Sequence, residues 1–252
     1  MSGFDLAVYC AEPERLEASR ALAERLGAPL LTGAEGSCWP RFALCYRDGC
    51  LKLLDAAAIK LGGLCVEVDP RPGEQHSYPA PKKDLIAQAV GRKTHAIIDA
   101  TAGWAQDGLA LFRMGYQVTL IERSPVMAAL IEDGLRRLSE KDWVKQRAIQ
   151  APALLAGDAI SLLSDLAGQA ECVYLDPMFP PKRKKSALAK KSMHVLRDIL
   201  GDDLDREQLF AAAWAAAGKR VVVKCPDYAA PLGGKPSASF QGKLLRFDVY
   251  LK

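Results

Sequence analysis

Residues 95–122 read HAIIDATAGWAQDGLALFRMGYQVTLIE, and their pattern indicates the fold class. Two apolar segments that we predict as strands, HAIIDA (95–100) and QVTLIE (117–122), flank GLALFRMG (108–115), which we predict as a helix. A strand, a helix and a strand in this order favour two parallel strands, because a parallel pair needs a crossover connection between its members. The stretch therefore predicts an α/β protein.

The same alternation continues around this stretch, from Lys82 to the C-terminus. Further helices are predicted at 84–91, 124–138, directly after 138, 158–168, about 187–200 and 205–217, and further strands at 151–157, 171–176, 220–225 and 244–251. Apolar strands separated by helices are typical of a doubly wound, mostly parallel sheet covered on both faces. Ligands bind such sheets at the carboxyl ends of the strands, so the residues that follow each strand are the candidate site residues.

The first third of the chain has a different pattern, which predicts a small α+β unit. Its predicted elements are a strand at 6–10, an amphipathic helix at 13–27, a hairpin at 41–55 with its turn at Asp48-Gly49, and a strand at 64–69. Four prolines in the twelve residues 70–81 exclude regular structure there. We therefore predict two domains, an N-terminal domain at 1–78 and a second domain at 79–252.

The composition is that of a globular protein with a mildly basic balance, with 252 residues, 50% hydrophobic residues and a net charge of +4. No stretch approaches the roughly 20 apolar residues of a membrane span, and the N-terminus lacks the pattern of a secretory signal, so we expect a cytoplasmic protein with no membrane partner. The seven scattered cysteines form no C-x-x-C pair, which favours buried thiols and no metal. A zinc site made of Cys38, Cys45, Cys50 and Cys65 is the alternative.

The loop after the first strand of the α/β region carries Asp99, Gly103 and Asp107. It lacks the G-x-G-x-x-G of a dinucleotide fold, and no P-loop precedes it. Its D-x-x-x-G arrangement is typical of a loop that binds S-adenosylmethionine (SAM), where the backbone approaches the methionine part of the cofactor. An ordinary turn between a strand and a helix is the alternative.

Carboxylates also follow the next two strands. Glu122 lies nineteen residues after Gly103, where it can accept hydrogen bonds from both ribose hydroxyls of an adenosine, as in NAD and SAM enzymes. Asp158 can accept from the adenine amino group while the N–H of Ala159 binds the ring edge, although Asp158 also suits a helix N-cap. These residues predict a nucleoside cofactor, and a surface Glu122 and a purely capping Asp158 are the alternatives.

The fourth strand ends in VYLDPMFPPKRKK, residues 173–185. The Asp176 carboxylate and the Pro177 carbonyl can accept the two hydrogens of an exocyclic base amino group, which draws the nitrogen lone pair out of the ring and makes it nucleophilic. Phe179 offers a face on which a flipped base can stack. Six of the ten residues from 182 to 191 are Lys or Arg and can bind phosphates, with a solvated loop as the alternative.

A resemblance accompanies these motifs. DPMF (176–179) resembles the D/N-P-P-Y/F signature of amino-group methyltransferases, and YLDPMFPPKRKKSALAKKSMHVLRDILGDDLD (174–205) closely resembles the bacterial ribosomal small-subunit methyltransferase J family. The likeness extends to DATAGWAQDGLAL, LIERSPVMAALIEDGL, RVVVKCPDYAAPL and KLLRFDVY. It covers most of residues 82–252 and, more loosely, the first third.

The resemblance implies a Rossmann-like SAM-dependent methyltransferase fold and an activity. The family transfers a methyl group from SAM to the exocyclic N2 of one guanosine in 16S rRNA and releases S-adenosylhomocysteine, which makes 16S rRNA or the small ribosomal subunit the expected partner. The implied cofactor contacts are Gln106, Asp107, Glu122, Arg123, Asp158, Ala159 and Asp176, and the expected RNA contacts are Lys182, Arg183, Lys184, Lys185, Lys190 and Lys191. Gln106 stands where the family pattern has Arg, and Asp158-Ala159 replaces the small hydroxyl residues common in the family.

Two other functions fit the sequence. The D/N-P-P-x motif grips any planar NH2 group, so the substrate amino group can belong to adenine or to a glutamine side chain. A non-catalytic RNA-binding or assembly factor would keep the fold and the basic segment. Calorimetry with SAM separates these functions, because a pure binding module should not bind SAM and an NAD enzyme should prefer NAD.

Overall fold

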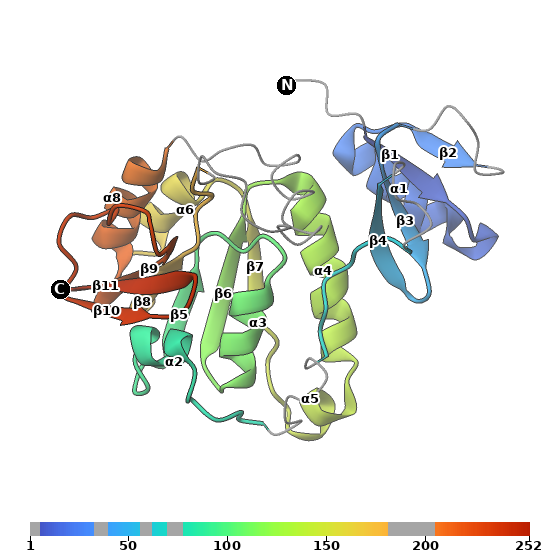
Figure 1. The fold of residues 1–252 in the computed structure, drawn as a ribbon. Helices are drawn as coiled ribbons and strands as arrows, with labels where there is room; N and C mark the ends of the chain where they lie inside the picture. Colours follow the sequence, from blue (N-terminus) through green and yellow to red (C-terminus); the bar gives the residue numbers. More distant parts are fainter. Residues whose placement is uncertain (1–5, 33–39, 56–61, 70–77, 181–204) are drawn as a thin grey trace. The chain divides into compact units, whose positions relative to one another are not determined.

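The computed structural model describes residues 6–32, 40–55, 62–69, 78–180 and 205–252 (Figure 1). Contacts divide the chain into two compact units, Met1–Val68 with Pro125–Ile149, and Asp69–Ser124 with Gln150–Lys252. Residues 125–149 lie inside the range predicted for the second domain, yet they group with the N-terminal residues. The division of the chain into an N-terminal domain at 1–78 and a second domain at 79–252 stays a proposal.

The second unit contains a seven-stranded sheet. Its strands are β5 (Ala96–Asp99), β6 (Gln117–Glu122), β7 (Ala153–Ala156), β8 (Cys172–Leu175), β9 (Arg220–Pro226), β10 (Ala238–Gln241) and β11 (Leu245–Leu251), in the order β10-β11-β9-β8-β5-β6-β7. β11 runs antiparallel to both of its neighbours, and all other neighbouring pairs are parallel. The predicted mostly parallel α/β sheet is confirmed.

The connection order places a crevice at the middle of this sheet. β5 lies between β6, the next strand in sequence, and β8, which the chain reaches only after β7. Successive connections therefore leave β5 in opposite directions, so the strand order reverses at β5. Such a switch point is where open α/β sheets bind ligands.

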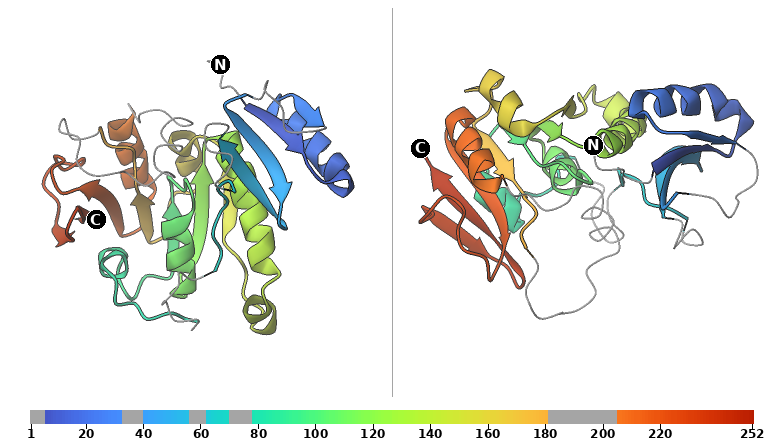
Figure 2. Two further views of the ribbon diagram at one scale, coloured as in Figure 1. Left: turned by 45° about the vertical axis from the view of Figure 1, so that its right-hand side comes forward. Right: turned by 90° about the horizontal axis from the view of Figure 1, so that it is seen from above.

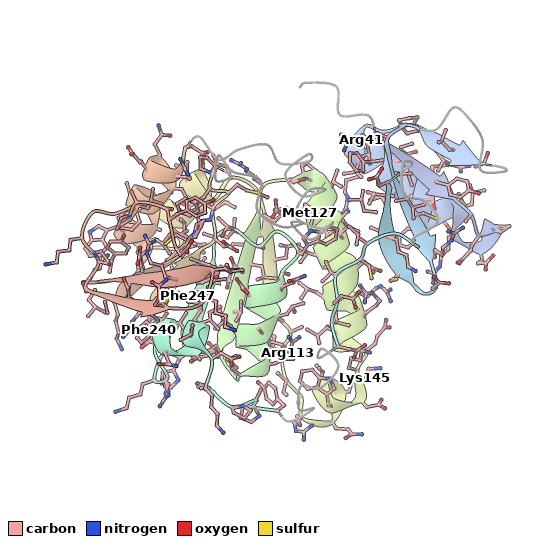
Figure 3. All side chains as sticks on the ribbon, in the orientation of Figure 1. Arg41, Arg113, Met127, Lys145, Phe240 and Phe247 are labelled. Carbon is pink, nitrogen blue, oxygen red and sulfur yellow. The ribbon has the colours of Figure 1, made fainter. Side chains whose placement is uncertain are left out.

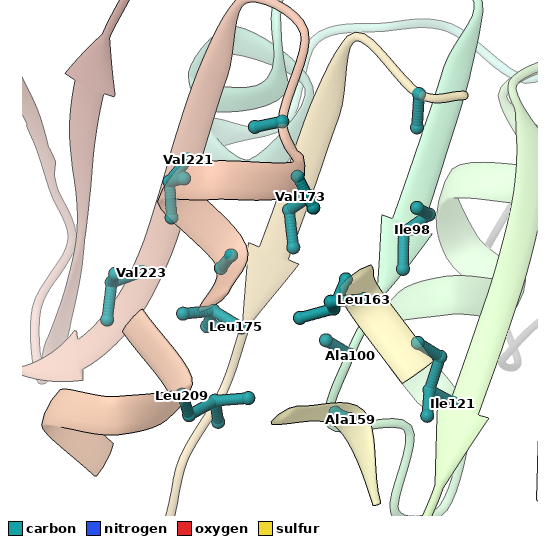
Figure 4. Packing of buried hydrophobic residues seen from close by; sticks show 14 of the residues in the cluster. Ile98, Ala100, Ile121, Ala159, Leu163, Val173, Leu175, Leu209, Val221 and Val223 are labelled. Atoms are coloured by element: carbon teal, nitrogen blue, oxygen red, sulfur yellow. The ribbon is translucent and has the colours of Figure 1, made fainter. Parts of the chain in front are cut away.

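Helices cover both faces of this sheet. They are α2 (Leu85–Val90), α3 (Gln106–Arg113), α6 (Ala159–Asp165) and α8 (Arg206–Ala216). α6 and α8 lie side by side (Figure 2), where Leu163 and Leu209 pack on Val173, Leu175 and Val223 (Figure 4). Because side chains alternate along a strand, Tyr174 points to the opposite face, where its hydroxyl meets α3.

One glycine sets the close approach of α3 to the sheet. A Cβ added at Gly108 would meet the Leu120 side chain and would lie 3.0 Å from Oδ2 of Asp99. Any larger residue would push the helix away from β5 and β6. Gly108 therefore keeps the first turn of α3, which carries Asp107, next to the end of β5.

The first unit contains a four-stranded sheet in the order β2-β1-β3-β4. Its elements are β1 (Leu6–Cys10), the short 3-10 helix η1 (Pro13–Arg15), α1 (Leu16–Leu26), β2 (Leu30–Thr32), β3 (Phe42–Arg47) and β4 (Cys50–Asp55). The predicted hairpin is confirmed, with φ of 54° at Asp48 and 75° at Gly49, as a type I′ turn requires. β2 was not predicted.

α4 (Pro125–Ser139) and α5 (Asp142–Gln146) complete the first unit. Asp133 of α4 accepts hydrogen bonds from the N–H of Leu51 in β4 (3.0 Å), from Arg137 (2.8 Å) and from Arg136 (2.9 Å). Arg137 also donates to the carbonyl of Val66 (2.8 Å). These bonds join the helix to β4 and to the segment beside it.

One predicted strand is wrong, and β10, like β2, was not predicted. Residues 64–69 were predicted as a strand, but only Leu64 forms a bridge, with Leu53. The carbonyl of Val66 accepts a hydrogen bond from the Arg137 side chain. This carbonyl therefore does not need a neighbouring strand as its partner. β10 was not predicted, because ASFQ (238–241) is largely exposed and lacks an apolar run. The helix predicted at 187–200 lies outside the described residues.

Candidate active site

A pocket lies among the loops that follow β5, β6, β7 and β8. Its walls are formed by Ala100, Thr101, Gly103, Ile121, Glu122, Arg123, Asp158, Ala159, Ile160, Asp176, Met178, Asp205 and Leu209. The structure thus brings together six residues singled out in the sequence: Gly103, Glu122, Arg123, Asp158, Ala159 and Asp176. Five others do not line the pocket: Asp99, Gln106, Asp107, Pro177 and Phe179.

Glu122 anchors the loop after β5. Its carboxylate is buried, with 4% of the residue exposed, and accepts from the N–H of Gly103 (2.8 Å) and from the N–H of Ser124 (2.8 Å). Each carboxylate oxygen has a second lone pair, so Glu122 can hold the loop and accept from a ligand as well. Its place in the pocket wall keeps the ribose prediction open and adds a structural role that the sequence did not suggest.

Asp158 is the N-cap of α6. Its Oδ1 accepts from the N–H of Ile160 at 3.0 Å, in the extended backbone conformation that suits an N-cap. The capping interpretation is therefore confirmed. Asp158 and Ala159 also line the pocket, so their predicted contacts with an adenine ring stay a prediction.

Arg123 reaches the residue that precedes α8. Its guanidinium lies 3.3 Å from Oδ2 of Asp205, and both residues line the pocket. The pair links the loop after β6 to the start of α8. Asp205 ends the stretch that carried the family resemblance, but nothing in its sequence neighbourhood assigned it to the pocket.

Asp176 belongs to a network of charged groups below the pocket. The Lys224 ammonium donates to Oδ2 of Asp176 (2.8 Å) and to Oδ2 of Asp107 (2.7 Å). The Tyr174 hydroxyl donates to the same oxygen of Asp107 (2.6 Å), and the N–H of Asp176 donates to Oγ1 of Thr101 (2.6 Å). Asp107 is therefore tied to Asp176 through one ammonium group.

Burial and charge set the protonation of this network. Burial lowers the pKa of Lys224, but the carboxylates of Asp176 and Asp107 outweigh burial, so that the pKa lies above its ordinary value. Burial and the nearby carboxylates both raise the pKa of Tyr174. Lys224 thus stays an ammonium and Tyr174 stays a hydroxyl donor at neutral pH.

Asp99 lies at the base of the same network and is 1% exposed. Burial and the negative charge of Asp107 raise the pKa of Asp99 to about 8. A protonated Asp99 leaves two carboxylates and one ammonium, which is an excess of one negative charge. A site with this balance favours a cationic ligand.

Of the three residues after Asp176, only Met178 lines the pocket. Pro177 and Met178 are buried, and Phe179 is half-buried against the cluster that contains Leu175 and Leu209. The guanidinium of Arg206 lies over the Phe179 ring, 5.2 Å from its centroid. Stacking of a base on Phe179 stays a prediction, and the basic residues 182–185, 190 and 191 lie outside the described residues.

Four residues of the pocket and its network were not predicted from the sequence: Lys224, Tyr174, Thr101 and Asp205. Only Lys224 had a visible signal, because it interrupts the apolar run of RVVVKC near the carboxyl end of a strand. Tyr174 sits inside an apolar run and looks like a core residue. Its contact with Asp107 depends on the packing of α3.

The described parts of the chain show no group of three His, Cys, Asp or Glu residues arranged to hold a metal ion. Cys45, Cys50 and Cys65 of the alternative zinc site are free thiols there, and Cys38 lies outside those parts. Within the same ranges, no helix has the length and apolarity that crossing a membrane requires.

Comparisons with known proteins agree with this geometry. Residues 37–252 match the family described as "Putative SAM-dependent methyltransferase". The chain is 43% identical to a ribosomal RNA small subunit methyltransferase J of Shewanella loihica, over 84% of the chain and 83% of that protein. It is 40% identical to the protein of the same name in Tolumonas auensis, over 98% of both chains. The crystal structure of a SAM-dependent methyltransferase from Neisseria gonorrhoeae is similar with a TM-score of 0.71 and 26% identity, over 97% of this chain and 95% of the other.

Proposed function

The chain belongs to the ribosomal RNA small subunit methyltransferase J family of SAM-dependent methyltransferases, and on this basis we propose that it methylates the exocyclic N2 of one guanosine in 16S rRNA. The observation that carries the proposal is the position of Asp176. It follows β8, lines the pocket and is held by Lys224. This is where the D-P-M-F motif needs an acceptor for a base amino group.

The pocket fits SAM by its donor and acceptor set. Besides Asp205, which pairs with Arg123, three carboxylates line the pocket at the switch point of the sheet, those of Glu122, Asp158 and Asp176. This set suits a ligand with a ribose diol, an adenine amino group and positive charge. When bound, SAM supplies an electrophilic methyl group on a sulfonium. The matching family and the similar crystal structure are both described as SAM-dependent methyltransferases, which supports SAM as the cofactor. The carboxylates support it because they can accept from its hydroxyl and amino groups.

We assign the cofactor contacts by position around the pocket. Glu122 accepts from the ribose hydroxyls while it holds the loop of Gly103. Asp158 and Ala159 bind the adenine edge at the start of α6, and Arg123 closes the pocket with Asp205. Asp99, Gln106 and Asp107 act from behind the wall, through the loop after β5 and the first turn of α3.

Asp176 and Pro177 orient the substrate nitrogen. An exocyclic amino nitrogen is a poor nucleophile because its lone pair is delocalised into the ring. Two acceptors aimed at its hydrogens localise the lone pair, and Pro177 has a fixed φ that holds its carbonyl in place. The nitrogen becomes strongly acidic once methylated and its proton can leave to water, so Asp176 need not act as a general base.

The RNA partner is proposed from the names of the relatives and from charge. The relatives are named for the small-subunit ribosomal RNA, and residues 182–191 carry six Lys or Arg. A substrate of this kind goes with a cytoplasmic location. We propose that the basic segment binds phosphates beside the target base.

Tritium transfer from labelled SAM to 16S rRNA, followed by nucleoside analysis, tests the proposal. Naked rRNA and isolated small subunits should be tried side by side, with Asp176→Ala as the inactive control. Label in N2-methylguanosine is the expected result. Label in methyladenosine would favour the adenine alternative, and failure to bind SAM in calorimetry would favour an RNA-binding assembly factor.

The RNA assignment has its own test. Neutralising Lys182, Arg183, Lys184 and Lys185 together should weaken RNA binding and reduce its salt dependence, by roughly 0.7 to 0.9 in log-log slope for each phosphate that is no longer bound. SAM affinity should stay unchanged. An unaltered slope would make the segment a solvated loop.

A further inference from the structure

Lys224 is a charged residue that follows the apolar central run of β9, a strand that begins with Arg220. In β9, Val221, Val222 and Val223 are buried, and Lys224 follows them directly. Leu175 pairs with Val223 across β8 and β9, so Lys224 is level with Asp176, one residue beyond each. On its other side Lys224 pairs with Phe247 of β11, whose side chain is labelled in Figure 3. The register of two strands therefore brings this ammonium to the end of β8.

The ammonium lies between two carboxylates of different elements. Asp176 follows β8, and Asp107 lies in the first turn of α3; both oxygens are within 2.8 Å of Nζ. The Lys224 side chain is 23% exposed, so water screens these contacts only in part. Without the ammonium, the two carboxylates would face each other in a half-buried site and repel.

We propose that Lys224 is a positioning residue for methyl transfer, whose ammonium holds the Asp176 carboxylate at the substrate amino group and fixes it to Asp107 at the start of α3. The inference rests on the proposed function, because it assigns Asp176 the role given there. It adds a residue that touches neither the base nor the cofactor and acts through a carboxylate.

The physical reason is geometric and electrostatic. A carboxylate on a loop after a strand can rotate about its side-chain bonds, and an acceptor displaced by about 1 Å can cost as much as 10²-fold in rate. A charge-assisted bond to a strand residue restrains that rotation. A cation beside a carboxylate also favours the ionised form, which is the form that accepts hydrogen bonds.

The groups that face Lys224 come from several elements. They are Asp107 on α3, Tyr174 on β8, Asp176 after β8 and, at the base of the network, Asp99 at the end of β5. The charge on Lys224 persists because Asp176 and Asp107 raise its pKa. The carboxylates are thus the groups whose titration changes when the lysine is removed.

The test compares Lys224→Met with Lys219→Met in single-turnover transfer to rRNA. Lys219 is a matched control: it directly precedes β9 and pairs with the Glu171 carboxylate, but its side chain is 66% exposed. Lys224→Met should lower the rate roughly 10- to 100-fold with little change in the KM for RNA. The acidic limb of its pH profile should move to higher pH, because the uncompensated carboxylates protonate more readily. Lys219→Met should behave as wild type.

A double-mutant cycle shows whether Lys224 acts through Asp176. In the Asp176→Asn background, Lys224→Met should cost no further rate beyond about twofold, because the charge it holds is already gone. Full additivity of the two losses would overturn the proposal, and so would a wild-type rate in Lys224→Met.

Thermal melts without SAM or RNA give a readout independent of activity. In Lys224→Met the repelling carboxylates have raised pKa values, so the stabilising proton is bound at low pH and lost as pH rises. The melting temperature of Lys224→Met should therefore approach that of wild type toward pH 5 and fall below it toward pH 8. A constant difference would overturn the proposal. If wild type itself transfers no methyl to rRNA, the proposed function fails, while the melts still decide whether Lys224 holds the carboxylates.

Discussion

Two clusters of charge, one in each unit, differ in their net charge. On α4, one carboxylate, Asp133, meets two guanidinium groups and a backbone N–H, and the residue is 6% exposed. At the edge of the large sheet, one ammonium, Lys224, meets two carboxylates. Arg136 also pairs with Glu140, so the first cluster, counted as ions, carries no net charge, whereas Lys224 with Asp107 and Asp176 carries −1.

This difference distinguishes a structural cluster from a candidate functional one. In the first cluster every oxygen of Asp133 accepts a bond from the protein, and the carboxylate joins α4 to β4. In the second, the excess negative charge lies beside a pocket, where a cationic ligand can complete it. Buried charge that is fully paired stabilises a fold, and buried charge that is left in excess marks a candidate site.

Breaking the first cluster should have the greatest effect. Asp133→Ala removes the buried carboxylate that two guanidinium groups and the N–H of Leu51 share, so the free energy of unfolding should fall by about 3 kcal/mol. Urea denaturation measures this loss. Glu132→Ala is the control, because that neighbour on the same helix is exposed and forms its ion pair with Arg25. Equal losses in the two variants would contradict the structural role.

The pH dependence of Asp133 has a definite sign. Burial raises the pKa of Asp133, but its bonds from Arg137, from Leu51 and from Arg136 outweigh burial and hold the pKa below its ordinary value. Its contribution is therefore present above the unfolded pKa and lost as pH falls through the folded pKa. The stability gap between wild type and Asp133→Ala should narrow in acid.

The next largest effect comes from a substitution that breaks the second cluster without unfolding the protein. Asp176→Ala removes the acceptor at the substrate nitrogen, so methyl transfer should fall by at least about 10²-fold, with Asp176→Asn less affected because it keeps an oxygen. Single-turnover rates on rRNA measure this, with thermal melts as the check on folding. Asp165→Asn, on the exposed end of α6, should keep the wild-type rate. A near-normal rate in Asp176→Ala would overturn the site.

A smaller effect concerns the cofactor wall. Glu122→Ala should weaken SAM binding by about 1.5 to 3 kcal/mol, because the ribose loses a charged acceptor and the loop of Gly103 loses its anchor. Isothermal calorimetry measures the affinity, and Glu132→Ala again serves as the control. Glu122→Gln keeps one acceptor oxygen, so its SAM affinity should lie between those of Glu122→Ala and Glu132→Ala. Unchanged SAM affinity in Glu122→Ala would exclude the ribose contact.

A last prediction concerns the pH dependence of stability and tests the charge balance of the second cluster. Asp99 has a folded pKa of about 8, above its unfolded value, so its contribution to stability is full below the unfolded pKa and lost as pH rises toward 8. Asp99→Asn should flatten the decline in stability between pH 5 and 8, where one carboxyl can contribute at most about 1.4 kcal/mol per pH unit. Identical slopes for both proteins would show that Asp99 is already ionised.

The local elements were largely predictable from the sequence. Apolar runs located β5, β6, β8 and β9, because a parallel strand that is covered on both faces is apolar over most of its length. Asp48-Gly49 located the hairpin turn, because few residues adopt positive φ twice in succession. Elements with weak patterns were not predicted correctly. β10 was missed because it is largely exposed. Residues 64–69 have the pattern of a strand, but the carbonyl of Val66 bonds to the Arg137 side chain instead of to a neighbouring strand.

The candidate site was predictable only in part. Each strand end offered a carboxylate or a glycine, so Gly103, Glu122, Asp158 and Asp176 could be named before their positions were known. Their assembly into one pocket follows from the parallel sheet, whose strand ends share an edge. Asp107 was named as a cofactor contact, but its bonds run to Tyr174 and Lys224 behind the pocket wall.

The α/β alternation, the D-P-M-F motif and the family could all be derived from the amino-acid sequence, because these depend on neighbours along the chain. The tertiary structure was needed to show that Lys224 lies between Asp107 and Asp176, that Glu122 holds Gly103, and that α4 groups with the first unit. Lys224 is 48 positions from Asp176 and 117 from Asp107. Contacts at such separations depend on strand order, register and helix packing, and periodicity within one element carries no information about which distant element lies beside it.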